Sequence, residues 1–228
     1  MADLFFNSAF LLSGWESSVR ITVSENGWIQ TITSGASSDG CENVPGIAVP
    51  GTPNLHSHAF QRAMAGLAER GTSNTDTFWS WRERMYAFLE RLSPEDVEAI
   101  AAQLYVELLR HGFTSVTEFH YLRNNVDGST YTDPVEMGQR ILSAADQAGI
   151  GTTLLPVLYR SSDFGNKPPA PEQKRFLADV DDLIGDIAAL KDSTANNPQY
   201  RIGLAVHSLR AVSPADLAHA VSSFRDID

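Results

Sequence analysis

Apolar and polar residues follow one pattern before Pro50 and another pattern after it. In the first part, short apolar and β-branched runs are separated by turn-forming residues, which is typical of antiparallel strands. The predicted strands are Leu4 to Leu12, Val19 to Val23, Trp28 to Ile32 and Val44 to Val49. The Asn26-Gly27 pair between two of these runs favours a tight hairpin turn. We therefore predict that residues 1–49 form the N-terminal part of a small β-rich domain.

After Pro50, apolar runs of strand length alternate with longer segments of helical period. The expected strands are a segment ending at His56, Phe113 to Phe119, Gly151 to Leu158 and Arg201 to Val206. The expected helices begin at Ser93, Asp133, Pro171 and Ser213, and the third of them ends near Lys191. Two of the helix starts combine Ser at the N-cap with Pro at the first helical position and an acid in the first turn.

Strands that alternate with helices at this spacing pair in parallel through βαβ units. Residues 50–228 then hold about four such units, half of a (β/α)8 barrel, which typically takes about 250 residues. We predict an α/β fold, the N-terminal half of a TIM barrel preceded by part of a small β domain. Because the sequence stops shortly after a helix, we expect it to be a truncated, N-terminal piece of a longer protein. The alternative is a small open α/β sheet that is complete as it stands.

Composition narrows the class of protein. The sequence has 17 basic and 28 acidic residues and a net charge of −11, which argues against nucleic acid or an anionic membrane as the main partner. A single cysteine, Cys41, rules out a disulfide within the chain and suits a reducing compartment. The N-terminus is a poor signal peptide, and no stretch approaches the roughly 20 apolar residues that span a bilayer. We therefore expect a cytoplasmic protein.

The most informative residues are His56 and His58, at the end of the first expected barrel strand. Residues i and i+2 of a strand point to the same face, so both imidazoles can reach one metal ion. Barrel enzymes have their sites at the carboxyl ends of the strands, where this pair is expected. We interpret the pair as metal ligands, and the alternative is two surface histidines. A catalytic zinc site needs at least three protein ligands, so this pair does not complete one.

The other four histidines differ in what their positions indicate. His111 follows a helix and suits a capping role, whereas His219 suits an exposed helical position. His120 and His207 each end an expected strand, and position alone leaves open whether either one faces the site or a loop.

Two arginines and a tyrosine are further candidates. Arg82 lies in an aromatic and basic cluster, residues 78–84, whose alternative is a helix that packs its tryptophans inward and leaves its charges in solvent. Arg210 follows the fourth strand, where an arginine can clamp a carboxylate with two hydrogen bonds. Tyr121 can donate a hydrogen bond from the same rim.

Five segments together carry a resemblance to a known family. They are residues 53–66 around the histidine pair, residues 78–86, Thr117 to Tyr121, Thr153 to Tyr159 and His207 to Val212. In their order and spacing, across nearly the whole chain, they resemble the formimidoylglutamate deiminases, a branch of the amidohydrolase superfamily. The His-x-His pattern by itself indicates only the superfamily, whereas the combination is specific to this branch.

The resemblance implies a metal-dependent barrel with one zinc ion per subunit, bound in part by His56 and His58. It implies hydrolysis of the formimino group of N-formimino-L-glutamate to N-formyl-L-glutamate and ammonia, a step of histidine degradation. The residues that it matches to substrate contacts are Gln61, Arg82, Tyr121, His207 and Arg210, with both arginines facing carboxylates. The expected partner is therefore a small dianionic amino-acid derivative, with neither nucleic acid nor membrane involved. A homodimer of the full-length protein is a further expectation.

The sequence departs from the family pattern in one large respect. The family continues with a His-x-His-x-Ala-Glu segment, a catalytic histidine and a metal-binding aspartate, none of which is present. We therefore expect no catalytic residue within this chain and expect the chain by itself to be inactive. Two alternative functions stay open. One is a deaminase of a nucleobase-like ring, which predicts a pocket without paired arginines, and the other is a non-catalytic binding module that kept the scaffold.

Overall fold

The computed structural model of the chain describes residues 1–67 and 78–227. They form two compact units, Met1–Gly51 and Thr52–Asp228. The domain boundary predicted after residue 49 falls close to this division.

The first unit is one mainly antiparallel sheet in the order β3-β2-β1-β4, with β5 also paired to β1. Its strands are β1 (Ala2–Leu11), β2 (Gly14–Val23), β3 (Ile29–Thr33), β4 (Glu42–Asn43) and β5 (Ile47–Ala48). The predicted hairpin joins β2 to β3, and Gly27 has the positive φ of +80° that an Asn-Gly turn requires. The strand predicted from Val44 to Val49 is wrong in extent. Pro45 lacks an N–H and Gly46 has φ +95°, so only two short pairings with β1 form around them.

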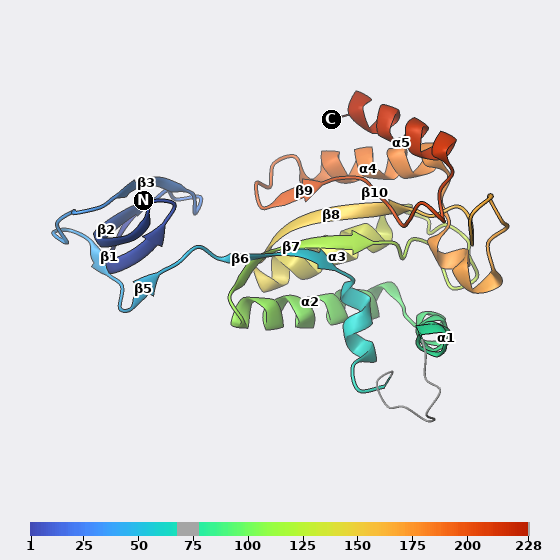
Figure 1. Ribbon diagram of the computed structural model, residues 1–228, viewed down its shortest axis with the longest axis horizontal. Helices are drawn as coiled ribbons and strands as arrows, with labels where there is room; N and C mark the ends of the chain where they lie inside the picture. The colour runs from blue at the N-terminus through green and yellow to red at the C-terminus, as the bar shows by residue number, and fades with distance from the viewer. Residues whose placement is uncertain (68–77, 228) are drawn as a thin grey trace. The chain divides into compact units, whose positions relative to one another are not determined.

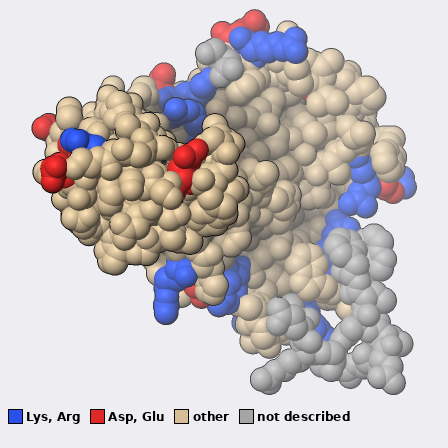
Figure 2. Space-filling view, turned by 60° about the vertical axis from the view of Figure 1, so that its left-hand side comes forward, with Lys and Arg blue, Asp and Glu red and all other residues tan. Residues whose placement is uncertain are grey.

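Large apolar side chains are exposed on this first unit. Examples are Trp15, Trp28, Ile29, Ile32 and Ile47. Charged side chains are sparse on the face of the unit that comes forward in Figure 2. A single sheet layer has two faces and can bury only one of them, which accounts for this exposure.

The second unit is built on a parallel sheet in the order β10-β8-β7-β6, with β9 also paired to β8 (Figure 1). Its strands are β6 (Thr52–Ser57), β7 (Phe113–His120), β8 (Gly151–Leu158), β9 (Tyr200–Ile202) and β10 (Ala205–Val206). Every pairing between them is parallel, so the predicted βα organisation is confirmed.

The helices of this unit are α1 (Phe78–Leu89), α2 (Pro94–Arg110), α3 (Glu136–Ala148), α4 (Val180–Thr194) and α5 (Pro214–Asp226), with short 3-10 helices η1 (Ala59–Met64) and η2 (Pro171–Phe176). Ser93 accepts a hydrogen bond from the Asp96 N–H, and the Asp96 side chain accepts one from the Ser93 N–H, so the predicted start of α2 is a capping box. Ser213 caps α5 through the Asp216 N–H. Within the described residues, no helix combines the length and the apolar character that crossing a membrane requires.

The two faces of the parallel sheet have different neighbours. Helix α2 packs on β7, α3 on β8, and α4 on β8 and β9. Along β7, the buried residues Val116, Glu118 and His120 alternate with residues of the other face, such as Phe119. Glu118 bonds Tyr105 of α2, so this first set points to the helices, whereas Phe119 contacts the rings of His56 and His58.

Two segments that the sequence predicted as one element each are divided into two elements in the structure. The helix predicted from Pro171 to Lys191 is wrong: η2 ends at Phe176, extended backbone follows, and α4 begins at Val180. The strand predicted from Arg201 to Val206 divides into β9 and β10 around Gly203, where a Cβ would lie only 2.6 Å from Leu155 Cδ2. The break at Gly203 allows close packing against β8, which hydrophobic periodicity alone does not encode.

Candidate metal and substrate site

His56 and His58 converge at the carboxyl end of β6. The Nε2 atoms of the two rings lie 3.0 Å apart, and the ring planes are nearly perpendicular, at 85°. Two nitrogens at this separation can both lie about 2.0–2.1 Å from one ion. The strand geometry that predicted a common face for the two side chains therefore agrees with the observed arrangement.

The orientation of His58 is set by the neighbouring strand. Its Nδ1 lies 3.0 Å from the backbone oxygen of Phe119 in β7, an acceptor, so Nδ1 carries the proton and donates. Burial lowers the pKa of His58, which favours the neutral ring. Nε2 then bears a lone pair on the side that faces His56. A carbonyl that fixes the tautomer in this way is the usual support of a metal-binding histidine.

The described residues bring together two candidate metal ligands, His56 and His58. Across residues 1–67 and 78–227, no three His, Cys, Asp or Glu side chains are grouped so that they could hold a metal ion. Glu118 is near in the sheet, but its carboxylate faces the helix layer, where it accepts hydrogen bonds from Ala59 N at 2.6 Å and Tyr105 Oη at 3.2 Å. It thereby anchors the backbone directly after His58.

Beside His58 lies a cavity of about 320 Å³. Six of the residues that the sequence singled out line it: His58, Gln61, Arg82, Tyr121, His207 and Arg210. They come from η1, from α1 and from the segments that follow β7 and β10, which are distant in the chain. All five predicted substrate contacts are thus gathered in one place, and their contact with a substrate stays a prediction. His56 is exposed beside this cavity and is not one of its lining residues.

Five lining residues were not predicted from the sequence: Trp81, Met85, Tyr86, Tyr159 and Phe176. Tyr86 lies one helical turn after Arg82, and Tyr159 follows β8 as Tyr121 follows β7, so sequence signals for these two existed. Phe176 gave no signal, because it lies in the 3-10 helix that the pattern assigned to a longer α-helix. The Trp79 side chain, part of the same predicted cluster, lies outside the described residues.

Hydrogen bonds fix several of these side chains. Gln61 Nε2 donates to Tyr121 Oη at 2.9 Å, and Arg82 Nε donates to Tyr86 Oη at 2.7 Å. The ring of Tyr159 lies 4.6 Å from the ring of His207, centroid to centroid. The cavity is therefore lined by side chains held in place by one another, as a preformed binding site requires.

His207 is neutral at pH 7. Burial, with smaller contributions from Arg210, His58 and Arg82, lowers its pKa to about 4. Its Nδ1 is buried and has no hydrogen-bond partner in the described part of the chain. A neutral imidazole offers one donor and one acceptor to a ligand.

The charges of the cavity have one sign. Arg82 and Arg210 are its two charged lining residues, and the described lining holds no carboxylate. Half-buried guanidinium groups in a lining without carboxylates favour an anionic ligand, because a carboxylate of the ligand can accept their hydrogen bonds. The arrangement suits a small molecule that carries carboxylates.

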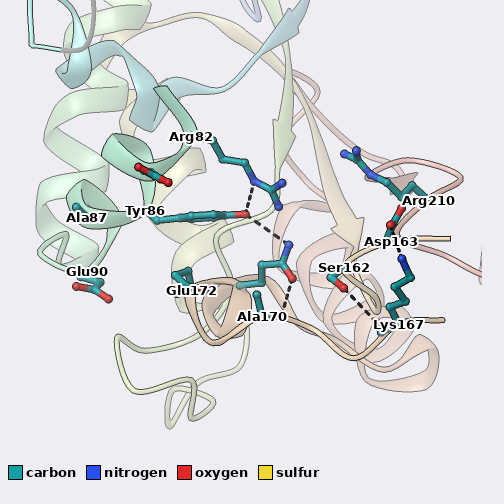
Figure 3. Close-up of a pocket in the computed structure, with 12 residues that line it drawn as sticks. Arg82, Tyr86, Ala87, Glu90, Ser162, Asp163, Lys167, Ala170, Glu172 and Arg210 are labelled. Carbon is teal, nitrogen blue, oxygen red and sulfur yellow. Dashed lines mark hydrogen bonds and ion pairs between the residues drawn. The ribbon is translucent and has the colours of Figure 1, made fainter. Parts of the chain in front are cut away.

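A wider hollow of about 830 Å³ adjoins this cavity and shares Arg82, Tyr86 and Arg210 with it (Figure 3). Lys167 and Asp163, which also line this hollow, form an ion pair at 2.9 Å. The shared residues therefore stand between the outer hollow and the cavity beside His58.

The remaining histidines and the cysteine lie elsewhere. His111 caps α2, its Nδ1 2.8 Å from the Glu107 carbonyl oxygen, and His219 is exposed on α5 beside Asp181, as the sequence indicated for both. His120, which the sequence left open, is buried among α3 and α4 and does not line the cavity. Cys41 is a free, partly buried cysteine of the first unit.

Comparison with known proteins identifies the family. The amidohydrolase family pattern matches residues 47–228. The chain is 45% identical over 226 residues to formimidoylglutamate deiminase of Pseudomonas aeruginosa, covering 99% of this chain and 50% of that protein. The chain thus spans about half the length of this curated relative.

Solved structures agree with this relationship. An amidohydrolase from Brucella melitensis has a TM-score of 0.92 and 41% identity, over 99% of this chain and 50% of that one. An atrazine chlorohydrolase from Arthrobacter aurescens, solved in complex with zinc, has a TM-score of 0.72 at 16% identity, over 100% of this chain and 50% of that one, which shows the fold alone. The predicted fold class, half of a (β/α)8 barrel preceded by part of a small β domain, is confirmed. The chain belongs to the amidohydrolase family.

Proposed function

We propose that the protein containing this chain hydrolyses the formimino group of N-formimino-L-glutamate, releasing ammonia and N-formyl-L-glutamate. The observation that carries the proposal is the single cavity in which His58 meets Arg82 and Arg210. It combines a candidate metal ligand with two guanidinium groups, and the substrate combines a hydrolysable C–N bond with two carboxylates. The similarity to a formimidoylglutamate deiminase supports the same reaction.

Zinc is the metal that we propose for the site. His56 and His58 fit it, because Nε2 of His58 is held as a free lone pair and imidazole nitrogen is a preferred zinc ligand. When bound, zinc makes a water molecule acidic enough to serve as a nucleophile near neutral pH. A related fold, the atrazine chlorohydrolase, was solved with zinc.

The protein's own residues bind and orient the substrate. Arg82 and Arg210 bind the two carboxylates, which also overcomes the repulsion expected from a chain of net charge −11. Gln61, Tyr121 and His207 complete the polar wall beside His58. Because His207 is neutral, it does not compete with the arginines as a third cation.

A deaminase of a nucleobase-like ring is the second candidate. The aromatic lining, which includes Trp81, Tyr159 and Phe176, favours it, because flat rings stack on aromatic side chains. The two arginines oppose it, since a neutral ring offers no carboxylate for their guanidinium groups to bind. We therefore rank the acidic substrate first.

The test uses the complete gene product that contains these residues. We expect zinc-dependent ammonia release from N-formimino-L-glutamate and none from adenosine or guanine. Arg82→Met is expected to keep bound zinc but to raise KM at least about tenfold, whereas His56→Ala is expected to lose both zinc and activity. Arg201→Met, an exposed arginine away from the cavity, is the control. Turnover of the rings but not of the amino-acid derivative would reverse the ranking.

A further inference from the structure

Three residues outside the predicted site form a connected group at its wall. They are Tyr86 of α1, Tyr159 after β8, and Gln173 of η2. Both tyrosines line the cavity beside His58, and Tyr86 also lines the outer hollow. Gln173 is fully buried, with 1% of its surface exposed, and lies between the two phenol oxygens.

Every polar atom of the Gln173 amide has a defined partner. Its Oε1 accepts a hydrogen bond from Ala170 N at 2.8 Å, so the amide cannot be turned over. Its Nε2 then donates to Tyr159 Oη at 2.7 Å and, at a longer 3.5 Å, faces Tyr86 Oη. Arg82 Nε donates to the same Tyr86 oxygen at 2.7 Å. Figure 3 shows this chain of contacts from Arg82 through Tyr86 to the buried amide.

The direction of these hydrogen bonds has a chemical consequence. Amide and guanidinium N–H groups can only donate, so the oxygens of Tyr86 and Tyr159 are the acceptors. Each phenol keeps its own O–H proton for donation to another group. Burial raises the pKa of Tyr159, so this hydroxyl stays protonated at neutral pH. Both hydroxyls border a cavity whose charged lining residues are two arginines.

We propose that Tyr86 and Tyr159 donate their hydroxyl protons to one carboxylate of the ligand, and that Gln173 is a positioning residue that fixes the direction of both. The inference rests on the proposed function and adds two tyrosines to the two arginines that bind the carboxylates of the substrate. An amide that donates to a phenol turns that phenol into a donor toward the ligand. A residue that accepted from the phenol would turn its proton away from the cavity.

The test is steady-state kinetics of the complete gene product. Tyr86→Phe and Tyr159→Phe are each expected to raise KM for N-formimino-L-glutamate about tenfold, with kcat changed less than about twofold, the signature of a lost binding interaction. Tyr200→Phe is the matched control, since its hydroxyl bonds Leu142 O and Asp146 away from the cavity. An unchanged KM in both cavity variants overturns the proposal.

The role of Gln173 needs a separate readout. Gln173→Met removes the donor at similar size and is expected to raise KM about tenfold. Combined with Tyr159→Phe it should raise KM no further, because both changes remove the same interaction. A purely structural role would lower Tm and give additive losses. Two substrate analogues, each lacking a different carboxylate, identify which carboxylate the tyrosines contact. For the analogue that lacks that carboxylate, the tyrosine variants and the wild type should have the same KM.

Failure of the two proposals is distinguishable. If the wild-type protein releases no ammonia, the proposed reaction is wrong. Binding of N-formyl-L-glutamate, which has the same two carboxylates, is then measured by calorimetry. Weaker binding by Tyr86→Phe and Tyr159→Phe than by the wild type supports the tyrosine contacts, and equal binding overturns them.

Discussion

Single residues show which parts of the site the sequence could predict. The common face of His56 and His58 follows from strand periodicity, and their nitrogens indeed approach to 3.0 Å. The tautomer of His58 could not be predicted, because it depends on the alignment of β7, whose Phe119 carbonyl accepts the Nδ1 proton. Local periodicity fixes directions along one strand, whereas the partner of a side chain is set by packing between strands.

His120 is the residue that sequence position left undecided. His120 is the last residue of β7, and the next residue, Tyr121, lines the cavity beside His58. Because side chains alternate along the strand, His120 points toward α3 and α4 instead. Both ring nitrogens are buried and have no hydrogen-bond partner among the described residues. Burial lowers the pKa of His120 to about 4.

This placement predicts an acid-sensitive contribution to stability. As pH falls from about 6.5 to about 4, the unfolded chain binds a proton at His120 that the folded protein does not bind, so stability is lost. His120→Leu removes the proton site and two unpartnered polar atoms. We expect an equal or higher Tm at pH 7 and a loss of stability on acidification to pH 4.5 that is smaller by about 2–3 kcal/mol.

The measurement is Tm between pH 7 and pH 4.5 for the complete gene product. His219→Leu is the matched control, because His219 is exposed on α5. Parallel curves for wild type and His120→Leu would contradict the prediction. His207 acts in the same direction, so the acid sensitivity is reduced by His120→Leu and not abolished.

Elements were predicted well where their ends carry local signals. The Ser-Pro starts of α2 and α5 lie where the sequence indicated, because a capping side chain bonds the backbone a few residues away. The division between η2 and α4 was missed for the opposite reason. Gln173 and Arg175 of η2 are buried against distant residues, and these contacts have no local pattern.

Arg175 shows what such a contact does for the site. Its guanidinium is buried and donates to the carbonyls of Leu89 and Leu92, at and just after the end of α1, and to Asn124 O at 3.0 Å. Helix α1 carries Arg82 and Tyr86 at the cavity wall. One buried cation thus ties the 3-10 helix to the helix that presents two cavity residues.

Replacing this residue should therefore affect both stability and binding. Arg175→Met removes the guanidinium donor from the carbonyls of Leu89 and Leu92, so we expect a loss of about 2–4 kcal/mol in unfolding free energy. We also expect a higher KM, because α1 then moves more freely. Thermal melting and kinetics of the complete gene product check this, with exposed Arg201→Met as control. A lower Tm with an unchanged KM would show that Arg175 stabilises the fold without affecting substrate binding, which would contradict the second part of the prediction.

At the scale of the whole molecule, the alternation of strands and helices predicted the parallel sheet, and packing details set its edges. β6 forms one edge, while β9 and β10 lie beyond β8 on the other side. Among the described residues, no further strand pairs with these edges. A closed barrel, in contrast, has no open sheet edge. The chain spans about half the length of the curated relative that it matches.

The donor set leads to a last prediction about residues 1–228 by themselves. A catalytic zinc site needs at least three protein ligands, and the described residues bring together two histidines and no group of three donors. We expect the isolated 228-residue chain to release no ammonia from N-formimino-L-glutamate and to self-associate through its uncovered sheet edges. Size-exclusion chromatography with a zinc-titrated ammonia assay checks both. Zinc-dependent release would contradict the prediction, and its dependence on protein concentration would then show whether a second copy supplies the missing ligands.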